Sequence, residues 1–561
     1  MSAPPEHRDQ TPHAPSEQTP ATPSRHPLDR VVFGVSAAAV AVFLAVALLF
    51  TERFADVTGG VLSWLTTNFG WAFVLGATGF VGFSFWLMLS RHGKIRLGRD
   101  DERPEFSTVS WFAMMFSAGM GIGLLFYGVS EPISHLATVP EAGIEPLTQE
   151  AERYSMVYSL FHWALHPWSI YAVVGLALAY AWYRKGRTGG FSAPFAPLLR
   201  GRTGPAKVID VLAIFATLFG TATSLGLGAA QINGGLDAVF GVPISATTQV
   251  LLVVVLTACF TLSAFSGIQR GIKWLSNTNM VLSIVLLFFL FVVGPTVFIL
   301  NLAPTATGNY LTQLPRISFR TGAYGGTEWL TGWTIFYWAW WMSWAPFVGT
   351  FLARISRGRT IRQFVLGVVA APSVIAVLWF SVLGGTALHA QMVDGLDLAG
   401  ITAQESQFFA LLDSLPLSSV SSLLVMAMIV IYFVTSADSA SLVMSSLSSQ
   451  GADEPNRLVT VVWALLIGAT AAILLWVGGA TGDDSSITAL QNIAIIVAAP
   501  FLVVMVALCV ALAKDLRSDP ASPPAGFLRD TTPTGGGATA ATAATSAAAA
   551  PRDGGTPAAR D

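Results

Sequence analysis

Residues 31–50 read VVFGVSAAAVAVFLAVALLF, an apolar stretch without a single charged side chain. A helix of about 20 such residues is long enough to cross the hydrocarbon core of a bilayer. Of the 561 residues in the chain, 53% are hydrophobic and only 11% are charged. An ordinary soluble domain has about 25% charged residues. The stretch and the composition together predict a membrane protein.

Eleven further apolar blocks of similar length follow the first. They cover residues 71–90, 107–129, 155–183, 208–230, 246–264, 280–302, 333–353, 365–386, 420–444, 459–477 and 487–513. We therefore predict an all-α membrane protein with twelve transmembrane helices in a domain spanning residues 30–514. The flanking segments, residues 1–29 and 515–561, are rich in Pro, Ser, Thr, Gly and Ala, and we expect both to be disordered tails.

The positions of Lys and Arg support this count, because cytoplasmic loops of membrane proteins are enriched in both residues. With both termini in the cytoplasm, 26 of the 30 basic residues fall on the cytoplasmic side or in the tails. The four on the outside are Arg53, Arg153, Arg316 and Arg320. We expect a multi-pass protein of the cell (inner) membrane. No basic domain is evident, so nucleic acid is not expected as a partner.

Residues 114–123 of the third block, MMFSAGMGIG, contain three glycines at alternate positions, Gly119, Gly121 and Gly123. Glycine is a poor helix former. A helix that unwinds within a membrane exposes backbone atoms that can hold an ion or a carboxylate. Small residues also allow two helices to pack closely. The spacing alone leaves both interpretations open, a broken binding helix and a packing face.

Residues 337–347 of the eighth block, YWAWWMSWAPF, contain four tryptophans. Trp340 and Trp344 are four residues apart and share a helix face, with Trp341 beside them. An indole face binds a cation well. A quaternary ammonium group cannot donate a hydrogen bond, so an aromatic cage suits it. The alternative is a belt of tryptophans at the membrane interface.

Residues 161–171 of the fourth block, FHWALHPWSIY, add Trp163, Trp168 and Tyr171 to the aromatic residues. Pro167 is expected to free a backbone carbonyl near them. His162 and His166 are four residues apart, a spacing that suits a metal. No third ligand is evident, so we expect structural histidines and no transition-metal site.

Hydroxyl side chains with helical spacing occur in the fifth and tenth blocks. They are Thr217 and Thr221 in the fifth block, and Thr435 and Ser436 in the tenth. Hydroxyl oxygens can bind alkali cations, but they also bond back to their own helix. Asp438 follows in the tenth block, and a carboxylate at that depth has to face a partner or a cavity.

These segments, together with FLARISRGR at residues 351–359, resemble the betaine/choline/carnitine transporter family from about residue 27 to residue 513. The resemblance implies a LeuT-like 5+5 inverted repeat preceded by two extra helices. The repeats would cover about residues 107–302 and 333–513, and the protein would be a homotrimer. It also implies a transporter that works by alternating access, and no enzyme.

The resemblance further implies a site for a quaternary-ammonium solute such as glycine betaine. Substrate would be bound by Trp340, Trp341, Trp344, Ala118, Gly119 and Met120, with Trp163, Trp168 and Tyr171 as an outer aromatic site. One sodium ion would be held by Ser117, Met120, Tyr432, Thr435 and Ser436, and a second by Thr217 and Thr221 beside Phe347. The hinge would comprise Gly119, Gly121 and Gly123.

Coupling is also inferred within the family. Proton-coupled choline transporters look to have an Asp where this chain has Gly123. Carnitine antiporters look to use an Arg from the fifth span, and residues 208–232 of this chain contain neither Lys nor Arg. Sodium symport is therefore preferred, with sodium as the coupling ion and no other cofactor. The alternatives are a proton-coupled choline or ectoine/proline-type transporter, a carnitine-type antiporter, a channel, and a receptor with a transporter fold.

Overall fold

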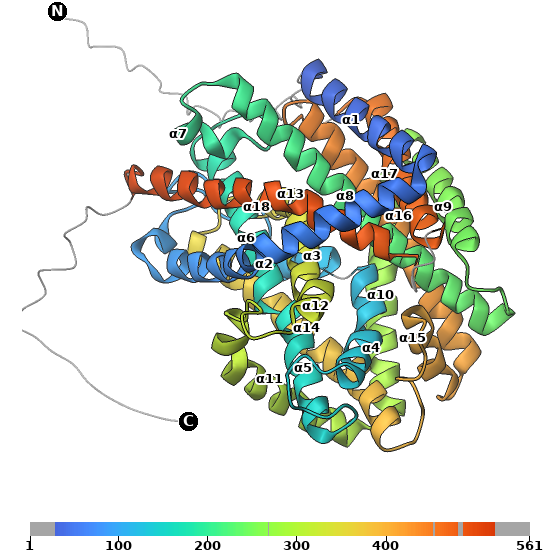
Figure 1. Ribbon diagram of the computed structural model, residues 1–561. Helices are drawn as coiled ribbons and strands as arrows, with labels where there is room; N and C mark the ends of the chain where they lie inside the picture. The colour runs from blue at the N-terminus through green and yellow to red at the C-terminus, as the bar shows by residue number, and fades with distance from the viewer. Residues whose placement is uncertain (1–27, 120, 267–268, 453–454, 481–485, 522–561) are drawn as a thin grey trace, which may run out of the picture. The chain divides into compact units, whose positions relative to one another are not determined.

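The computed structural model describes residues 28–119, 121–266, 269–452, 455–480 and 486–521, and this part of the chain is helical without a β-strand (Figure 1). Within it, ten helices are long and apolar enough to cross a membrane. They are α1 (Arg30–Leu49), α2 (Thr51–Leu89), α5 (Gln149–Trp163) continued by α6 (Leu165–Ala179), α8 (Thr203–Phe240), α9 (Ala246–Ser266), α10 (Gln269–Val293), α14 (Ile361–Met392), α16 (Ser418–Ser448), α17 (Arg457–Ala480) and α18 (Thr488–Arg517). The prediction of an all-helical, multi-pass membrane protein is confirmed.

The third predicted block is not a continuous helix. It consists of α3 (Thr108–Gly119) and α4 (Ile122–Ala137), which contain 12 and 16 residues. Gly121 precedes α4 in an extended conformation, with φ −152° and ψ −177°. Each piece is shorter than the roughly 20 residues that a crossing needs. The glycine-rich stretch therefore marks a break, as one of its two interpretations predicted.

The eighth block is also irregular. It begins with α12 (Thr327–Leu330), passes through a π-helical turn η4 (Thr331–Ile335) and continues as α13 (Phe336–Ile355). Neither the third nor the eighth block is among the ten helices above, so the predicted count of twelve crossings stays a prediction. Turns of π-helix inside α-helices are frequent at functional sites.

The fourth block is interrupted shortly before Pro167. Ala164 separates α5 from α6 with φ −97° and ψ −110°. Pro167 lies in the first turn of α6, where a backbone N–H has no partner inside the helix in any case. Pro167 has no N–H to offer the carbonyl of Trp163, four positions earlier, so the interruption lies where the proline is expected to free a carbonyl. A second π-helical turn, η2 (Tyr180–Arg184), ends this segment.

The seventh block was placed wrongly. Residues 280–302 include the end of α10 and the beginning of α11 (Thr296–Ser318), which Gly294 and Pro295 separate. The apolar run continues across this junction, so hydropathy alone does not register the break. The remaining short helices are η1 (Arg91–Lys94), η3 (Ala193–Phe195), α7 (Ala196–Leu199) and α15 (Gln404–Asp413).

The folded domain extends beyond its predicted end at residue 514. A carboxylate in the last turn of α18 and one just after it bind arginines at the end of the fourth segment: Arg187 contacts Asp515, and Arg184 Nη2 lies 2.9 Å from Asp519 Oδ1. Burial raises the pKa of Asp519, but hydrogen bonds from Arg184 and Tyr180 outweigh it and hold this pKa well below its usual range. A polar sequence that reads as a tail is thus fixed by ion pairs. The rest of the predicted tails, residues 1–27 and 522–561, lies outside the described residues.

Helices far apart in the sequence pack in a regular scheme. α6 packs against α14, α8 against α16, and α9 against α17. α13 contacts α6, α8 and α18, while α4 contacts α5, α8 and α14. α4 and α13 thus share α8 as a neighbour, and together with α6 and α14 they provide most of the walls of the site described next.

Candidate functional site

A cavity lies where α4, α6, α13 and α14 meet, beside the break between α3 and α4. Its lining is almost entirely apolar and is dominated by aromatic rings. The lining residues are Met115, Gly121, Gly123, Leu124, Trp163, Pro167, Trp168, Tyr171, Trp340, Trp341, Trp344, Val348, Pro372, Ile375 and Ala376. The two aromatic groups predicted as an inner and an outer site therefore line one cavity.

The aromatic rings around this cavity have different orientations. Trp340 and Trp341 are stacked, with ring centroids 4.6 Å apart and planes at 15°. Trp163 meets Trp341 edge-on at 4.9 Å and 74°. Trp344 lies 6.4 Å from Trp340 at 47°. Because the rings are not all parallel, a group within the cavity meets indole faces from several directions, which is how an aromatic cage binds a cation.

Hydrogen bonds between helices fix three of these indoles. Trp340 Nε1 donates to Ser224 Oγ of α8 at 3.2 Å, and Trp341 Nε1 donates to the carbonyl of His162 at 3.0 Å. Trp163 Nε1 donates to Glu131 Oε2 of α4 at 2.7 Å. An indole held by its N–H cannot rotate without losing that bond. The cage is therefore ordered before any ligand binds.

Two lining residues keep a buried donor without a partner among the described residues. These are the Nε1–H of Trp344 and the hydroxyl of Tyr171. Leaving such a group unpaired costs about 1–3 kcal/mol. Other atoms of both residues line the cavity.

The three predicted hinge glycines differ in what their surroundings require. A Cβ atom on Gly123 would lie 2.7 Å from Trp340 Cη2 and 2.8 Å from Trp163 Cη2, so only glycine fits between the two indoles. A Cβ atom on Gly121 would lie 4.0 Å from Trp344, an ordinary contact. Gly119 ends α3, and its surroundings lie outside the described residues. Gly123 thus provides clearance for the cage, whereas a hinge role stays a prediction for all three.

The threonines predicted to bind sodium donate their hydroxyl protons to their own helices. Thr217 donates to Ala213 O at 2.8 Å, Thr221 to Thr217 O at 2.7 Å, and Thr435 to Ile431 O at 2.8 Å. Hydrogen bonding within the helix is the alternative to ion binding that their spacing left open. A hydroxyl that donates its proton keeps two lone pairs, so the same oxygen can still bind a cation.

The other predicted sodium ligands are spread over several elements. Tyr432 is buried in α16 and its hydroxyl lies 2.9 Å from Ser283 Oγ, Ser436 is half-buried, and Phe347 meets Trp344 edge-on at 5.8 Å. Ser117, Ala118 and Gly119 form the end of α3, but their side chains lie outside the described residues, as does all of Met120. Both sodium sites stay predictions.

The two histidines predicted as a pair lie in different surroundings. His166 stacks on Trp338 at 4.9 Å and 18°, and neither of its ring nitrogens has a partner among the described residues. His162 instead contacts Glu131 Oε1 through Nδ1 at 2.7 Å and Thr334 Oγ1 through Nε2 at 3.0 Å. Both rings contact Phe161 and Trp338, but only His162 has hydrogen-bond partners among the described residues.

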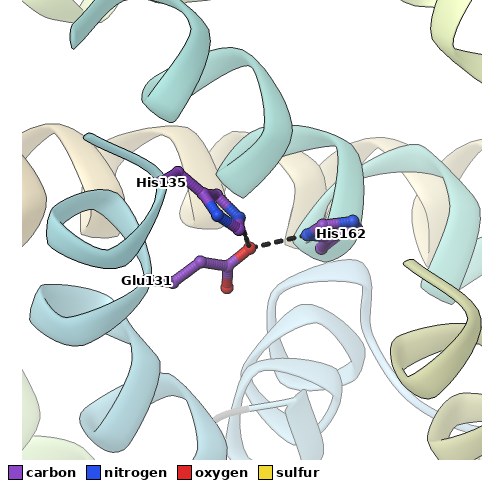
Figure 2. Close-up of side chains that lie close together, drawn as sticks. All are labelled: Glu131, His135 and His162. Carbon is purple, nitrogen blue, oxygen red and sulfur yellow. Dashed lines mark hydrogen bonds and ion pairs between the residues drawn. The ribbon is translucent and has the colours of Figure 1, made fainter. Parts of the chain in front are cut away.

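Glu131 is a buried acid that the sequence analysis missed. Figure 2 shows one of its carboxylate oxygens between His162 and His135, with His135 Nε2 3.2 Å from Oε1. The ligand atoms of these three residues lie within 4.8 Å of one another, so the expectation that His162 has no further potential ligand beside it is wrong. Glu131 lies two residues beyond the predicted third block, and an acid that close to a span is a signal for function.

Comparison with known proteins fits this geometry. Residues 31–521 match the family described as BCCT, betaine/carnitine/choline family transporter. The glycine betaine transporter OpuD of Bacillus subtilis is 44% identical over 493 residues, which are 87% of this chain and 94% of the relative. The betaine/ectoine transporter LcoP of Corynebacterium glutamicum is 41% identical over 502 residues, 88% and 79% of the two chains. An ectoine/hydroxyectoine transporter of Virgibacillus pantothenticus is 40% identical over 480 residues, 85% and 94% of the two.

The match covers nearly the whole described domain and includes the aromatic cavity and the broken third segment. The family predicted from the sequence motifs is confirmed, and with it the expectation of a transporter and not an enzyme. This chain belongs to the betaine/carnitine/choline family of membrane transporters.

Proposed function

We propose that this protein imports glycine betaine, or a closely related solute with a trimethylammonium group and a carboxylate, by sodium symport with alternating access. The observation that carries the proposal is the buried cavity lined by Trp163, Trp168, Tyr171, Trp340, Trp341 and Trp344. Two relatives named as betaine transporters, from Bacillus subtilis and Corynebacterium glutamicum, support the same class of solute.

The chemistry of the cavity favours a cation that also has a carboxylate. A trimethylammonium group offers no N–H donor, and indole faces attract it with roughly 0.5–2 kcal/mol each. The unpaired donors on Trp344 and Tyr171 suit an acceptor oxygen of the same ligand. Choline offers only a hydroxyl, so a betaine fits these donors better. Backbone N–H groups at the break beside Gly121 are further candidates for the carboxylate.

Sodium is proposed as the coupling ion on three grounds. The hydroxyl oxygens of Thr217, Thr221 and Thr435 lie on α8 and α16, which pack against each other. The contacts around Gly123 leave no room there for an acidic side chain of the kind expected in a proton-coupled choline transporter. The stretch of α8 from residue 208 to residue 232 contains no Lys or Arg that could replace an ion.

We further propose twelve crossings built as a LeuT-like 5+5 inverted repeat, with both termini in the cytoplasm and a homotrimeric assembly. The repeats would pair the fourth crossing with the ninth, the fifth with the tenth, and the sixth with the eleventh. The helices at these positions, α6 and α14, α8 and α16, and α9 and α17, pack directly against each other. Partners related by a pseudo-two-fold axis do so when they lie near that axis, which supports this arrangement.

The test is uptake of radiolabelled glycine betaine by cells that lack their own importers. We expect uptake in sodium buffer and very little after sodium is replaced by potassium. Trp344→Leu should lower uptake at least about ten-fold, because it removes one indole face and one donor. Trp64→Leu is the matched control, since Trp64 is 60% exposed on α2 and lies outside the cavity.

Near-normal uptake by Trp344→Leu, with both variants present in the membrane at wild-type amounts, would contradict the cage. Unchanged uptake in potassium would contradict sodium coupling and leave the cage intact. Currents far above carrier turnover would instead favour a channel.

A further inference from the structure

We propose that Glu131, which does not line the cavity, gives the aromatic cage its preference for a positive charge by holding and polarising Trp163. Glu131 is thus a positioning residue for substrate recognition. This inference rests on the proposed function, because it concerns the same cavity and the same class of cation.

The contacts of the Glu131 carboxylate join three helical segments. Oε2 accepts hydrogen bonds from Trp163 Nε1 at 2.7 Å and from the Tyr337 hydroxyl at 2.5 Å. Oε1 contacts His162 Nδ1 at 2.7 Å and His135 Nε2 at 3.2 Å, as Figure 2 shows. The side chain is completely buried. An indole N–H can only donate, so Oε2 acts as an acceptor.

The four partners suit an ionised carboxylate, which accepts up to four hydrogen bonds. Among the described residues, only the two histidines lie within ion-pair distance of Glu131, and neither Lys nor Arg does. His135 Nδ1 is buried without a partner in that part of the chain, so a second proton on this ring would be left unpaired. His162 Nε2 faces the Thr334 hydroxyl, which can donate to it. Both histidines can therefore donate to Glu131 as neutral rings, and the four donors around the carboxylate stabilise its negative charge without cancelling it.

This charge reaches the cavity chiefly through Trp163, and secondarily through Tyr337. Trp163 lines the cavity directly. Tyr337 stacks on the cavity residue Trp341, with centroids 5.8 Å apart and planes at 25°. An anion bonded to an indole N–H shifts electron density into the ring, because hydrogen-bonded groups polarise one another in a low-dielectric interior. The face that a cation meets then becomes more negative. Glu131 thus makes Trp163 a stronger cation-binding ring than an unanchored indole.

The experiment compares two ligands of the same shape and different charge. Glycine betaine and 3,3-dimethylbutanoate both carry a carboxylate, but the second has a neutral tert-butyl group where the first has trimethylammonium. The purified full-length protein is titrated with each ligand, following tryptophan fluorescence. We expect the wild type to bind betaine more tightly than the neutral analogue.

Glu131→Gln removes the charge and preserves the bonding pattern. The amide oxygen can accept from Trp163 and Tyr337, while the amide nitrogen donates to the other tautomer of His162. We expect the preference for betaine over the neutral analogue to fall about ten-fold, since a hydrogen bond to a charged group is much stronger than one to a neutral group. Binding of the neutral analogue should be nearly unchanged. In uptake, KM for betaine should rise by a similar factor while kcat stays close to that of the wild type.

A double-mutant cycle tests whether the effect passes through Trp163. Trp163→Phe removes the N–H that bonds to Glu131, so adding Glu131→Gln to it should have little further effect on the ligand preference. Trp341→Phe is the matched control, because the Trp341 N–H bonds to the His162 carbonyl. In that background Glu131→Gln should keep most of its effect.

Each outcome decides the question. An unchanged preference in Glu131→Gln, or an equal loss of affinity for both ligands, would overturn the inference, the second because Glu131 would then be only structural. If Glu131→Gln does not fold, Trp163→Phe alone should lose part of the preference, and full retention would overturn the inference. A wild type that does not distinguish the two ligands would instead contradict the proposed cation cage itself, and the inference with it.

Discussion

The aromatic cavity and the hydroxyl residues of α8 and α16 differ in where their hydrogen bonds go. The indoles of Trp163, Trp340 and Trp341 all donate to residues outside their own helical segment. The hydroxyls of Thr217 and Thr435 donate to carbonyls one turn back on the same helix. Bonds between helices hold the cage in one geometry, so it is ready for a ligand. Bonds within a helix do not fix the position of a neighbouring helix. An ion site at these hydroxyls therefore depends on groups from other elements.

The largest expected effect comes from filling the space between two cage indoles. Gly123→Ala should reduce betaine uptake by about ten-fold or more, because overpacking a rigid site costs about 1–3 kcal/mol and the added Cβ would lie 2.7 Å from Trp340. The measurement is KM and maximal rate of uptake at saturating sodium. If Gly123→Ala transports like the wild type, the cage is not rigid and the contrast with the hydroxyl sites fails.

Gly79→Ala is the matched control for this substitution. Gly79 also lies within a long helix, α2, but nothing would lie within 4 Å of its added Cβ. Uptake by this variant should stay close to that of the wild type. A loss of uptake in both variants would indicate that alanine harms the protein through its helices and not through the cage.

A smaller effect is expected from loosening one indole while leaving its ring in place. Ser224→Ala removes the acceptor of the Trp340 N–H, and a lost hydrogen bond of this kind costs about 1 kcal/mol. The KM for betaine should therefore rise roughly five-fold, with little change in the sodium dependence. Ser373→Ala serves as the control, since Ser373 bonds only to Val369 O in its own helix. A change in sodium dependence equal to the change in KM would show that the two regions are not separable.

The accuracy of the sequence-based predictions also differs between features set within one helix and features set between helices. The grouping of Trp340, Trp341 and Trp344 in one cavity could be predicted because they lie within little more than one turn of one helix. Gly123 was found as part of a break, but its contact with Trp163 could not be, since those residues are 40 positions apart. Local glycine propensity offered the break in the third segment as one of two interpretations, and the structure decided between it and close helix packing.

The sequence analysis missed features that depend on partners far away in the sequence. His162 and His166 have the same spacing as two bonded structural histidines would, yet only His162 finds hydrogen-bond partners, and these come from other segments. Glu131 gains its meaning from Trp163 and Tyr337, which are 32 and 206 residues away. Asp519 reads as part of a polar tail until Arg184 is placed beside it. Tertiary partners of this kind are not encoded in the spacing of one segment.

The smallest expected effect concerns the hydroxyl region. Thr435→Val keeps the shape of the side chain and removes its oxygen. If that oxygen binds sodium, the concentration of sodium that half-saturates uptake should rise a few-fold, because one ligand among several is lost. Betaine affinity at saturating sodium should stay close to that of the wild type, since the cage indoles are held by other residues. The measurement is uptake across a sodium series at fixed betaine, followed by a betaine series at the highest sodium concentration.

Thr66→Val is the matched control, because the Thr66 hydroxyl makes the same bond one turn back, to Leu62 O, on a helix with no predicted ion site. An unchanged sodium dependence in both variants would leave Thr435 with the intrahelical role that Thr66 has. A rise confined to Thr435→Val would assign its oxygen to the ion. The reciprocal effect should then appear as well: at low sodium, betaine should bind Thr435→Val more weakly, because two ligands that stabilise the same state must raise each other's affinity by the same factor.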